Sequence, residues 1–301
     1  MVNAAPRKAP LRRLRREWKY YLFILPGLLM LLTFFYYPAL SALYYAFLDW
    51  DGGAAKIFIG LENFRDAFQD PLLRDGFKNL AVLTLLGLLF TVSAPLIVAE
   101  LIFHLRSARL RRVYQVIFLI AGLVPVVVTI LIWQFIYDPY FGPLNALLEK
   151  LGLGKMALLW LADPHLAIYC LVFIGFPWVS GTSVLIFLAG LNTIPTSILD
   201  YGRLDGIGAL RRFWHIDIFF IFGQLRLMVI TGFIVLMQAF GLQLILTGGG
   251  PGTATMVPGY HMYLNAFRYD RLGYASAVGL VIALLILVFT VLNLKYLRAK
   301  E

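Results

Sequence analysis

Residues 192–217 read NTIPTSILDYGRLDGIGALRRFWHID, a polar segment between two long apolar runs. The segment is long for a connection within a helical bundle, where about 2–8 residues is usual. Asn192 and Pro195 suit the start of a short helix, and Gly206 permits the bend that would end it. The sequence therefore predicts a short helix, a glycine break and a second helix. Such a projection either docks into a groove of another protein or is a solvated connector.

The composition of the whole chain is that of an integral membrane protein. Of its 301 residues, 61% are hydrophobic and 14% are charged, and the mean hydropathy is +0.81. A soluble domain of 34.0 kDa has too little interior to bury this much apolar surface. A soluble enzyme, a disulfide scaffold and a disordered regulator are therefore excluded. The single cysteine, Cys170, lies in an apolar run, where a packing role is expected.

Six apolar runs are each long enough, at about 20 residues, to cross a bilayer. The runs are Tyr21–Ala46, Leu80–Phe103, Tyr114–Tyr137, Ala167–Leu191, Ile218–Leu246 and Tyr274–Leu294. The predicted fold is therefore an all-α integral membrane protein with six transmembrane helices. Residues 1–19 are predicted to be a basic tail, and residues 20–301 the transmembrane domain. The first run is longer than the about 7–15 apolar residues of a cleaved signal peptide, so it is predicted to remain as an anchor helix.

The charged residues divide unequally between the two sides of the membrane that these six spans define. The side with both termini has 18 of the 26 Lys and Arg residues but only 6 of the 16 Asp and Glu residues. Cytoplasmic segments of membrane proteins carry an excess of Lys and Arg, so both termini are predicted to be cytoplasmic. The basic residues that give the net charge of +10 are thus distributed as in a protein oriented in a lipid bilayer, and they do not indicate a nucleic-acid partner.

The predicted spans have no ionisable side chain near their centres. Glu100, Asp217 and Arg226 lie toward cytoplasmic ends, where they are interpreted as interfacial charges whose side chains reach water. An ion-coupled transporter binds its driving ion near the membrane centre through such side chains. The sequence therefore predicts that uphill transport by this chain would use energy from another subunit.

Neutral polar side chains within the spans are candidates for a substrate path. Hydroxyl, amide and indole groups recognise sugars by hydrogen bonding and stacking, and the candidates are Trp178, Ser183, Gln238 and Gln243. The alternative is interhelical hydrogen bonding. Five residues correspond to about 140° around a helix, so Gln238 and Gln243 are not expected to face one narrow pore.

Sequence motifs for catalysis are absent. Gly154-Lys155 is followed by Met156, which excludes a Walker A loop, and the sequence has no Cys/His cluster of a metal site. We therefore predict no catalytic residue, no metal site and no cofactor bound by this chain. Gly248–Gly252 is interpreted as a flexible turn. One alternative is a membrane enzyme, which would need clustered His, Asp or Glu; the four histidines alternate between the two sides of the membrane, which argues against such a cluster. The other alternative is a secondary transporter or channel subunit for a neutral polar solute.

The polar segment resembles the coupling-loop signature E-A-A-x3-G-x9-I-x-L-P of the permease subunits of binding-protein-dependent ABC importers. Asp200-Tyr201-Gly202 stand at E-A-A, Gly206 at the glycine, Ile216 at the isoleucine and Ile218-Phe219 at Leu-Pro, all at the spacing of the signature. Further matches are similar to the first of the two permeases in carbohydrate importers of the maltose and glycerol-phosphate type. These matches are Pro26-Gly27, Tyr37-Pro38, Gly60–Phe64, Ala189–Leu191, Arg203–Gly206, Arg212-Phe213, Leu246–Pro251 and Gly273–Ala277.

The resemblance implies a type I ABC importer permease fold with a cytoplasmic coupling helix in the coupling loop 192–217. It implies a multi-pass subunit in the cytoplasmic membrane of a bacterium or archaeon that forms half of a sugar path. The implied partners are a second permease as heterodimer, an ATPase dimer that holds ATP and Mg²⁺, and an extracytoplasmic sugar-binding protein. That protein is expected to touch Asp49–Lys78 and Tyr140–His165, with Trp160 as a candidate anchor.

The signature also implies which residues contact the ATPase. These coupling residues are Asp200, Tyr201, Gly202, Arg203, Asp205 and Gly206. Three departures stand within the signature: aspartate replaces glutamate, Tyr201 and Gly202 replace two alanines, and Phe219 replaces proline. Tyr201 implies an ATPase groove of a different shape, and hence a dedicated or specially matched ATPase. Gly241 stands where the family often has aspartate.

Overall fold

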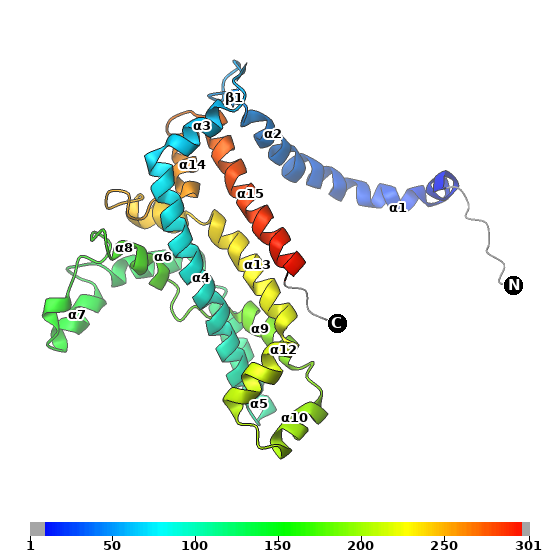
Figure 1. The fold of residues 1–301 in the computed structure, drawn as a ribbon, viewed down its shortest axis with the longest axis vertical. Coiled ribbons are helices and arrows are strands. Elements are labelled where there is room, and N and C mark those ends of the chain that lie inside the picture. The colour runs from blue at the N-terminus through cyan, green and yellow to red at the C-terminus, as the bar shows by residue number, and fades with distance from the viewer. Residues whose placement is uncertain (1–9, 297–301) are drawn as a thin grey trace.

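The computed structural model describes residues 10–296, and its regular elements are helices apart from one short hairpin (Figure 1). Residues 1–9 of the predicted tail and residues 297–301 lie outside the described residues. From Pro10 onward the tail is helical and continuous with the first predicted span.

The first half of the chain contains the hairpin and seven α-helices. Its elements are α1 (Pro10–Leu31), η1 (Leu32–Tyr36), α2 (Tyr37–Tyr45), β1 (Leu48–Asp49), β2 (Ile57–Phe58), α3 (Glu62–Gln69), α4 (Pro71–Phe103), α5 (Ala108–Ala121), α6 (Val126–Ile136), α7 (Pro143–Lys150) and η2 (Gly154–Met156). The two strands are antiparallel, with Leu48 opposite Phe58.

The second half is helical. Its elements are α8 (Ala167–Phe173), α9 (Gly181–Leu191), α10 (Thr196–Leu204), α11 (Ala209–Arg212), η3 (Phe213–Asp217), α12 (Ile218–Phe220), α13 (Phe222–Gln238), η4 (Gln243–Thr247), α14 (Pro258–Phe267) and α15 (Leu272–Tyr296).

Four helical stretches are long and apolar enough to cross a membrane, and the number reaches six if each of two bent helix pairs counts as one span. The four are Trp18–Tyr45, Pro71–Phe103, Phe222–Thr247 and Leu272–Tyr296. They contain the first, second, fifth and sixth predicted spans or most of each. The prediction of membrane-spanning helices is therefore confirmed, whereas the remaining two spans need correction.

The third predicted span is not a straight helix. Its halves α5 and α6 meet at 83°, because Gly122 ends the first half and Pro125, which lacks a backbone N–H, caps the second. The fourth predicted span is divided as well. Helix α8 ends before Gly175, which has a φ of +98°, and α9 begins only at Gly181. The bent pair at this place is α9 with α10, at 76°.

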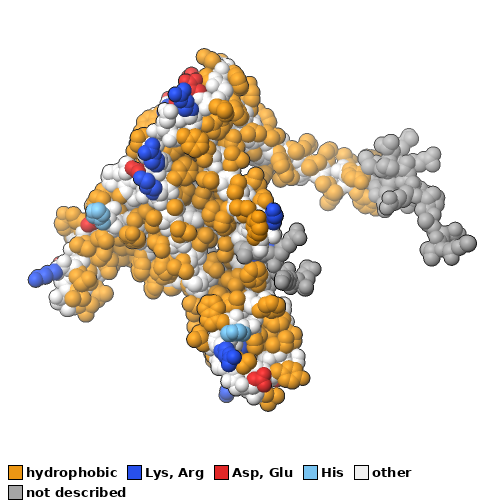
Figure 2. Space-filling view, in the orientation of Figure 1, with side chains coloured by type: hydrophobic (Ala, Val, Ile, Leu, Met, Phe, Trp, Pro, Cys, Tyr) orange, Lys and Arg blue, Asp and Glu red, His pale blue; other side chains and the backbone are white. Residues whose placement is uncertain are grey.

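The packed interior is concentrated at two ends. At one end, α4, α9 and α13 enclose Phe187, Leu188 and Ile221 in an apolar cluster. At the other end, α3, α4, α14 and α15 enclose two further clusters around Leu73, Val278 and other residues. Figure 2 shows that hydrophobic side chains cover most of the surface and that charged side chains gather mainly beside α3, along the α7 side and around α10.

Helices α1 and α2 form an arm that extends away from the other helices in Figure 1. None of the most apolar 18-residue window of Trp18–Tyr45 is buried inside the chain, and the arm contacts the body mainly where α2 packs on α15. The arm therefore presents an apolar surface that this chain does not cover.

The segment Gly248–Gly252 is a packed loop and not the predicted flexible turn. Thr255 is fully buried beside it and donates a hydrogen bond to the carbonyl of Gly250 at 2.7 Å. Asn79 of α4 donates to the carbonyls of Thr253 and Met256 at 2.8 and 2.9 Å. These bonds hold the loop against the end of α4 that carries α3.

Candidate functional site

Helix α10 begins directly after Pro195 and ends in a Schellman motif. The N–H of Gly206 donates to the carbonyl of Arg203 at 3.1 Å, and the N–H of Ile207 donates to that of Gly202 at 2.9 Å. Gly206 has a φ of +67°, a left-handed conformation that glycine adopts without cost. The predicted glycine bend between two short helices is therefore present.

One face of α10 packs against its own chain and the other is open. Gly202 is buried, and a Cβ built on it would contact the side chains of Ile216 and Ile207 at 3.5 and 3.8 Å. The other predicted coupling residues, Asp200, Tyr201, Arg203, Asp205 and Gly206, are exposed. Asp200 accepts a hydrogen bond from Arg203 at 2.9 Å within this open face, an exposed ion pair worth about 0–1 kcal/mol.

Three apolar side chains of the same projection were missed by the sequence prediction. Leu204 is 82% exposed, and Leu210 and Trp214 are also exposed. Their signal in the sequence is that these large apolar residues stand among the charged and polar residues of the segment. We call Thr196–Trp214 the coupling knob; in Figure 1 it forms the end of the molecule labelled α10. Its open face combines charged and apolar side chains.

Two charges interpreted as reaching water are instead buried where the knob joins the bundle. The side chain of Asp217 is 1% exposed and accepts a hydrogen bond from Nε of Arg212 at 3.0 Å. The side chain of Glu100 on α4 is 12% exposed. The interpretation that the side chain reaches water is therefore wrong for Asp217, whereas Glu100 is largely but not fully covered and lies 3.6 Å from the partly exposed His104.

A cavity of about 500 Å³ lies among α4, α6, the α8–α9 break and the end of α13. Trp178 and Gln243 both line it, together with Thr91 and Thr129, and no ionisable side chain is among the described residues that line it. Three chain breaks therefore meet at one cavity: the start of α6, residues 174–178, and residues 239–243. Irregular backbone within a membrane protein occurs where it is buried in protein or lines a cavity.

Trp178 is held rigidly at the edge of this cavity. Its φ of 57° is unusual for a bulky residue, and its indole N–H donates to the carbonyl of Val172 at 2.9 Å. The ring stacks on Phe90 with the centroids 4.3 Å apart, and Phe173 and Phe176 meet it edge-on. The candidate is thus a fixed aromatic surface.

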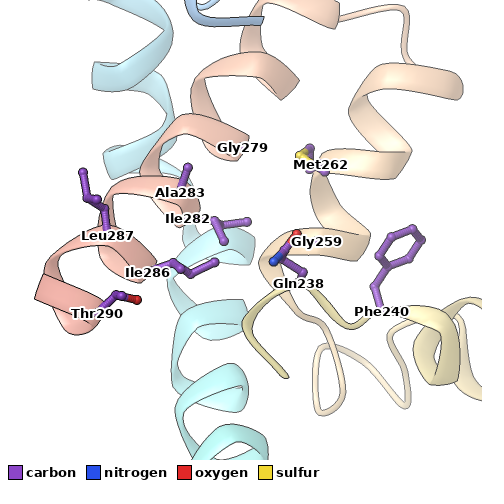
Figure 3. A pocket seen from close by; sticks show the side chains of 10 residues that line it. All are labelled: Gln238, Phe240, Gly259, Met262, Gly279, Ile282, Ala283, Ile286, Leu287 and Thr290. Carbon is purple, nitrogen blue, oxygen red and sulfur yellow. The ribbon is translucent and has the colours of Figure 1, made fainter. Parts of the chain in front are cut away.

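The other two substrate-path candidates lie elsewhere. Gln238 lines a separate cavity of about 550 Å³, which Figure 3 shows with Gln238, Phe240 and Met262 facing the side chains of α15. Ser183, in the first turn of α9, lines neither cavity. The expectation that Gln238 and Gln243 face different ways agrees with this arrangement, although its cause is the break after Gln238 and not the rotation of a continuous helix.

The opposite end of the molecule has a buried polar network that the sequence did not indicate. Asp70 caps α4, accepts a hydrogen bond from the hydroxyl of Tyr274 at 2.9 Å, and lies 3.0 Å from Nε2 of His261. Burial would raise the pKa of Asp70, but the bonds from Tyr274 and the backbone and the charge of His261 outweigh it, and the pKa is lowered. Burial lowers the pKa of His261 despite the nearby Asp70.

Trp160 is not an exposed anchor. Its indole N–H donates to Oδ1 of Asn145 at 2.8 Å, and its ring packs near Tyr137. Asn145 in turn donates to two backbone carbonyls, so both residues hold the α7 segment together. The exposed aromatic side chains there are Tyr140 and Phe141, at 84% and 82%. Within residues 10–296, no group of three or more His, Cys, Asp or Glu is arranged to hold a metal ion.

The broken helices, the shared cavity and the coupling knob define a multi-pass membrane protein of the transporter permease class. Comparison with known proteins specifies the family. A probable ABC transporter permease protein of Pyrococcus horikoshii is 30% identical over 273 residues, which cover 89% of this chain and 91% of that protein. The chain belongs to the ABC transporter permease proteins and is a permease subunit, not an ATPase.

Other comparisons agree. The sn-glycerol-3-phosphate transport system permease protein of Pectobacterium atrosepticum is 28% identical over 290 residues, covering 95% of this chain and 96% of that one. The fold matches a chain of a bacterial ABC transporter involved in the import of the acidic polysaccharide alginate. The TM-score is 0.85 at 20% identity, over 98% of this chain and 100% of the other. No family model matches the sequence.

Proposed function

We propose that this permease forms half of the translocation pathway of an ATP-driven importer for a neutral sugar or oligosaccharide. The observation that carries the proposal is the coupling knob: a short exposed helix, with the spacing of the coupling signature, at one end of a bundle whose breaks enclose a cavity. A projection with an open charged and apolar face suits a groove in another protein.

The partner at the coupling knob is an ATPase dimer, which holds ATP and Mg²⁺; this chain holds no cofactor. The contact residues are Asp200, Tyr201, Gly202, Arg203, Asp205 and Gly206, and the exposed Leu204, Leu210 and Trp214 extend the contact. Gly202 contributes from beneath, because it lets Ile207 and Ile216 pack close to α10. ATP binding moves the knob, the spans open outward, and hydrolysis resets them, which is alternating access.

A second, non-identical permease completes the pathway. The arm formed by α1 and α2 supports this partner, because its apolar side chains from Trp18 onward are exposed and its own chain packs on it mainly through α15. The known transporter for alginate has been crystallised with a periplasmic protein that carries an alginate pentasaccharide. A corresponding binding protein here would contact Asp49–Lys78 and Tyr140–His165, with Tyr140 and Phe141 as anchors.

The cavity supports a neutral sugar as the substrate. Trp178 offers a fixed ring for stacking, and Gln243, Thr91 and Thr129 offer amide and hydroxyl groups. The relatives named for glycerol phosphate and alginate handle anions, which call for cationic side chains such as Arg or Lys. No such side chain is among the described residues that line the cavity.

The proposed location is the cytoplasmic membrane of a bacterium or archaeon, with both termini and the coupling knob on the cytoplasmic side. The positive-inside distribution of Lys and Arg supports this orientation.

Purification from the native membrane in mild detergent, with identification of all stoichiometric companions by mass spectrometry, tests the proposal. We expect a second six-span permease and an ATPase, with or without a binding protein. Recovery of this chain alone or as a homo-oligomer, in a detergent that preserves a known ABC complex, would refute the proposal. It would favour a secondary transporter or channel subunit for a neutral polar solute.

A further inference from the structure

A buried ion pair lies where the coupling knob joins the bundle, beside the apolar contacts of Phe213 and Ile216. Arg212 lies at the end of α11, and Asp217 is the last residue of η3, from which the chain continues into α12 and α13. Their side chains are 13% and 1% exposed, and Nε of Arg212 is 3.0 Å from Oδ2 of Asp217. The pair therefore spans the joint through which any movement of the knob reaches the fifth span.

The same pair faces α4. The guanidinium carbon of Arg212 is 5.7 Å from the ring centroid of Phe103. Glu100, about one turn earlier on α4, has Oε2 3.6 Å from Nδ1 of His104 and Oε1 buried without a hydrogen-bond partner among the described residues. Arg212 thus pairs with the carboxylate of the joint and lies against the end of the second span that carries Glu100. The guanidinium of Arg212 therefore lies between the joint and α4, which are about 115 residues apart in the sequence. Charges interact strongly over short distances in a buried site.

Without the ion pair between Arg212 and Asp217, the turn at residues 213–217 is free to change its shape. Residues 213–217 form a π-helix, a type of turn with wider hydrogen bonding that occurs mostly as short insertions at functional places. Phe213 and Ile216 pack on the apolar cluster around Phe187, but Trp214 is exposed. A short, wide turn between two helices can absorb displacement by changing its own shape, unless a directional contact fixes its two ends.

The buried atoms left over allow a second arrangement. Nη2 of Arg212, Oδ1 of Asp217 and Oε1 of Glu100 are buried without a hydrogen-bond partner among the described residues. One spare donor and two spare acceptors therefore lie around the same guanidinium. Since such buried groups are costly when unpaired, a small shift of the joint that pairs them is favourable.

We propose that Arg212 and Asp217 are positioning residues that transmit displacement of the coupling knob to the second and fifth spans, with Glu100 as the acceptor on the second span. This inference rests on the proposed function, because transmission has meaning only if an ATPase moves the knob. Asp200 and Gly206 contact the partner, whereas Arg212 and Asp217 act inside this chain.

The decisive variant is Asp217→Asn. It keeps the shape of the side chain and an amide oxygen that can accept the hydrogen bond from Nε of Arg212, but it removes the negative charge of the pair. Arg212→Met would instead leave two buried carboxylates facing each other without a cation, which destabilises the fold strongly. Arg212→Lys keeps the positive charge but loses the planar guanidinium group. It is the test variant if the Asp217→Asn protein does not assemble.

The complete transporter, reconstituted with both permeases, the ATPase dimer and the binding protein in proteoliposomes, supplies the measurement. The readout is the amount of sugar imported per ATP hydrolysed. We expect Asp217→Asn to assemble and hydrolyse ATP with a ratio at least fivefold below that of the wild type, and Arg212→Lys to show a smaller decrease. Arg109→Gln removes an exposed charge of α5 and is the control, with an unchanged ratio.

An unchanged ratio in Asp217→Asn would overturn the inference. This includes the case in which import and hydrolysis fall in proportion, because a merely structural pair would lower both together. Failure of the wild-type complex to import any sugar with ATP would instead refute the proposed function. The two failures are therefore distinguishable in one experiment.

Discussion

Substitution of Gly206 separates the two reasons for which a glycine can stand at the end of α10. Its φ is +67°, and a Cβ built on it has no heavy atom within 4 Å apart from its immediate neighbours in the chain. The fold therefore has room for any side chain, and only the left-handed backbone opposes substitution inside this chain. For most L-residues that cost is about 1–2 kcal/mol, whereas Asn and Asp adopt the conformation more readily.

The two reasons predict opposite orders of activity. If only the bend mattered, Gly206→Asn would import sugar better than Gly206→Ala, because a cost of about 1 kcal/mol reduces the bent population about fivefold. If the ATPase approaches closely, the larger side chain is worse. We predict the second order, with Gly206→Ala retaining measurable import, Gly206→Asn less, and Gly206→Asp none. A buried uncompensated charge costs several kcal/mol, which lowers ATPase affinity more than 100-fold.

Uptake of labelled sugar into cells, normalised to membrane abundance by immunoblot, gives the order, and co-purification of the ATPase shows where activity is lost. All three variants are expected at normal abundance, since no contact within the chain is broken. Normal uptake by Gly206→Asp at normal abundance would refute the coupling assignment. Better import by Gly206→Asn than by Gly206→Ala would show that the bend alone matters.

The structure yields four further predictions. Gly202→Ala, which restores a signature alanine, should leave import within twofold of the wild type, because the new methyl group would lie 3.5 Å from Ile216; an immunoblot-normalised uptake assay decides. Leu204→Asp should abolish ATPase co-purification while the permease still inserts, since it places a charge on the open apolar face; retained co-purification would remove Leu204 from the contact. Trp178→Ala should lower import of a neutral sugar at least tenfold in kcat/KM with ATPase assembly unchanged, because stacking is lost; equal import would exclude the cavity from the path. Thermal stability of the purified complex should fall as the pH drops below about 6.5, because the pKa of His261 is lowered in the folded chain and the unfolded chain therefore binds more protons there. The lowered pKa of Asp70 adds a second decrease toward pH 3.8 and below. His261→Gln should flatten the first decrease, and a profile identical to that of the wild type would contradict this reasoning.

Apolar run length predicted the membrane class and the positions of the long helices well, because a span needs about 20 apolar residues whatever it packs against. It could not predict the breaks at Gly122–Pro125 and around Gly175. Gly and Pro are common in transmembrane helices, where neighbours can satisfy the freed backbone groups. Whether such a residue merely sits in a helix or ends it depends on packing from elsewhere in the chain.

The coupling knob was predictable because its signature is local, whereas the burial of Asp217 was not. Its partner Arg212 is only five residues away, but the burial comes from α4, more than 100 residues earlier. Trp160 shows the same limit, because the hydrogen bond from its indole N–H to Asn145 cannot be predicted from its position in an outer segment. Both residues are determined by tertiary contacts that one sequence does not reveal.

The arm of α1 and α2 has a consequence for biosynthesis. Most of its apolar length from Trp18 onward has no cover within its own chain, so in the isolated subunit this helix is surrounded by lipid. If the proposed second permease covers part of the helix, assembly removes that part from contact with lipid and with membrane proteases. Co-expression of the two proposed subunits is then expected to raise the yield of this permease above that from its gene alone.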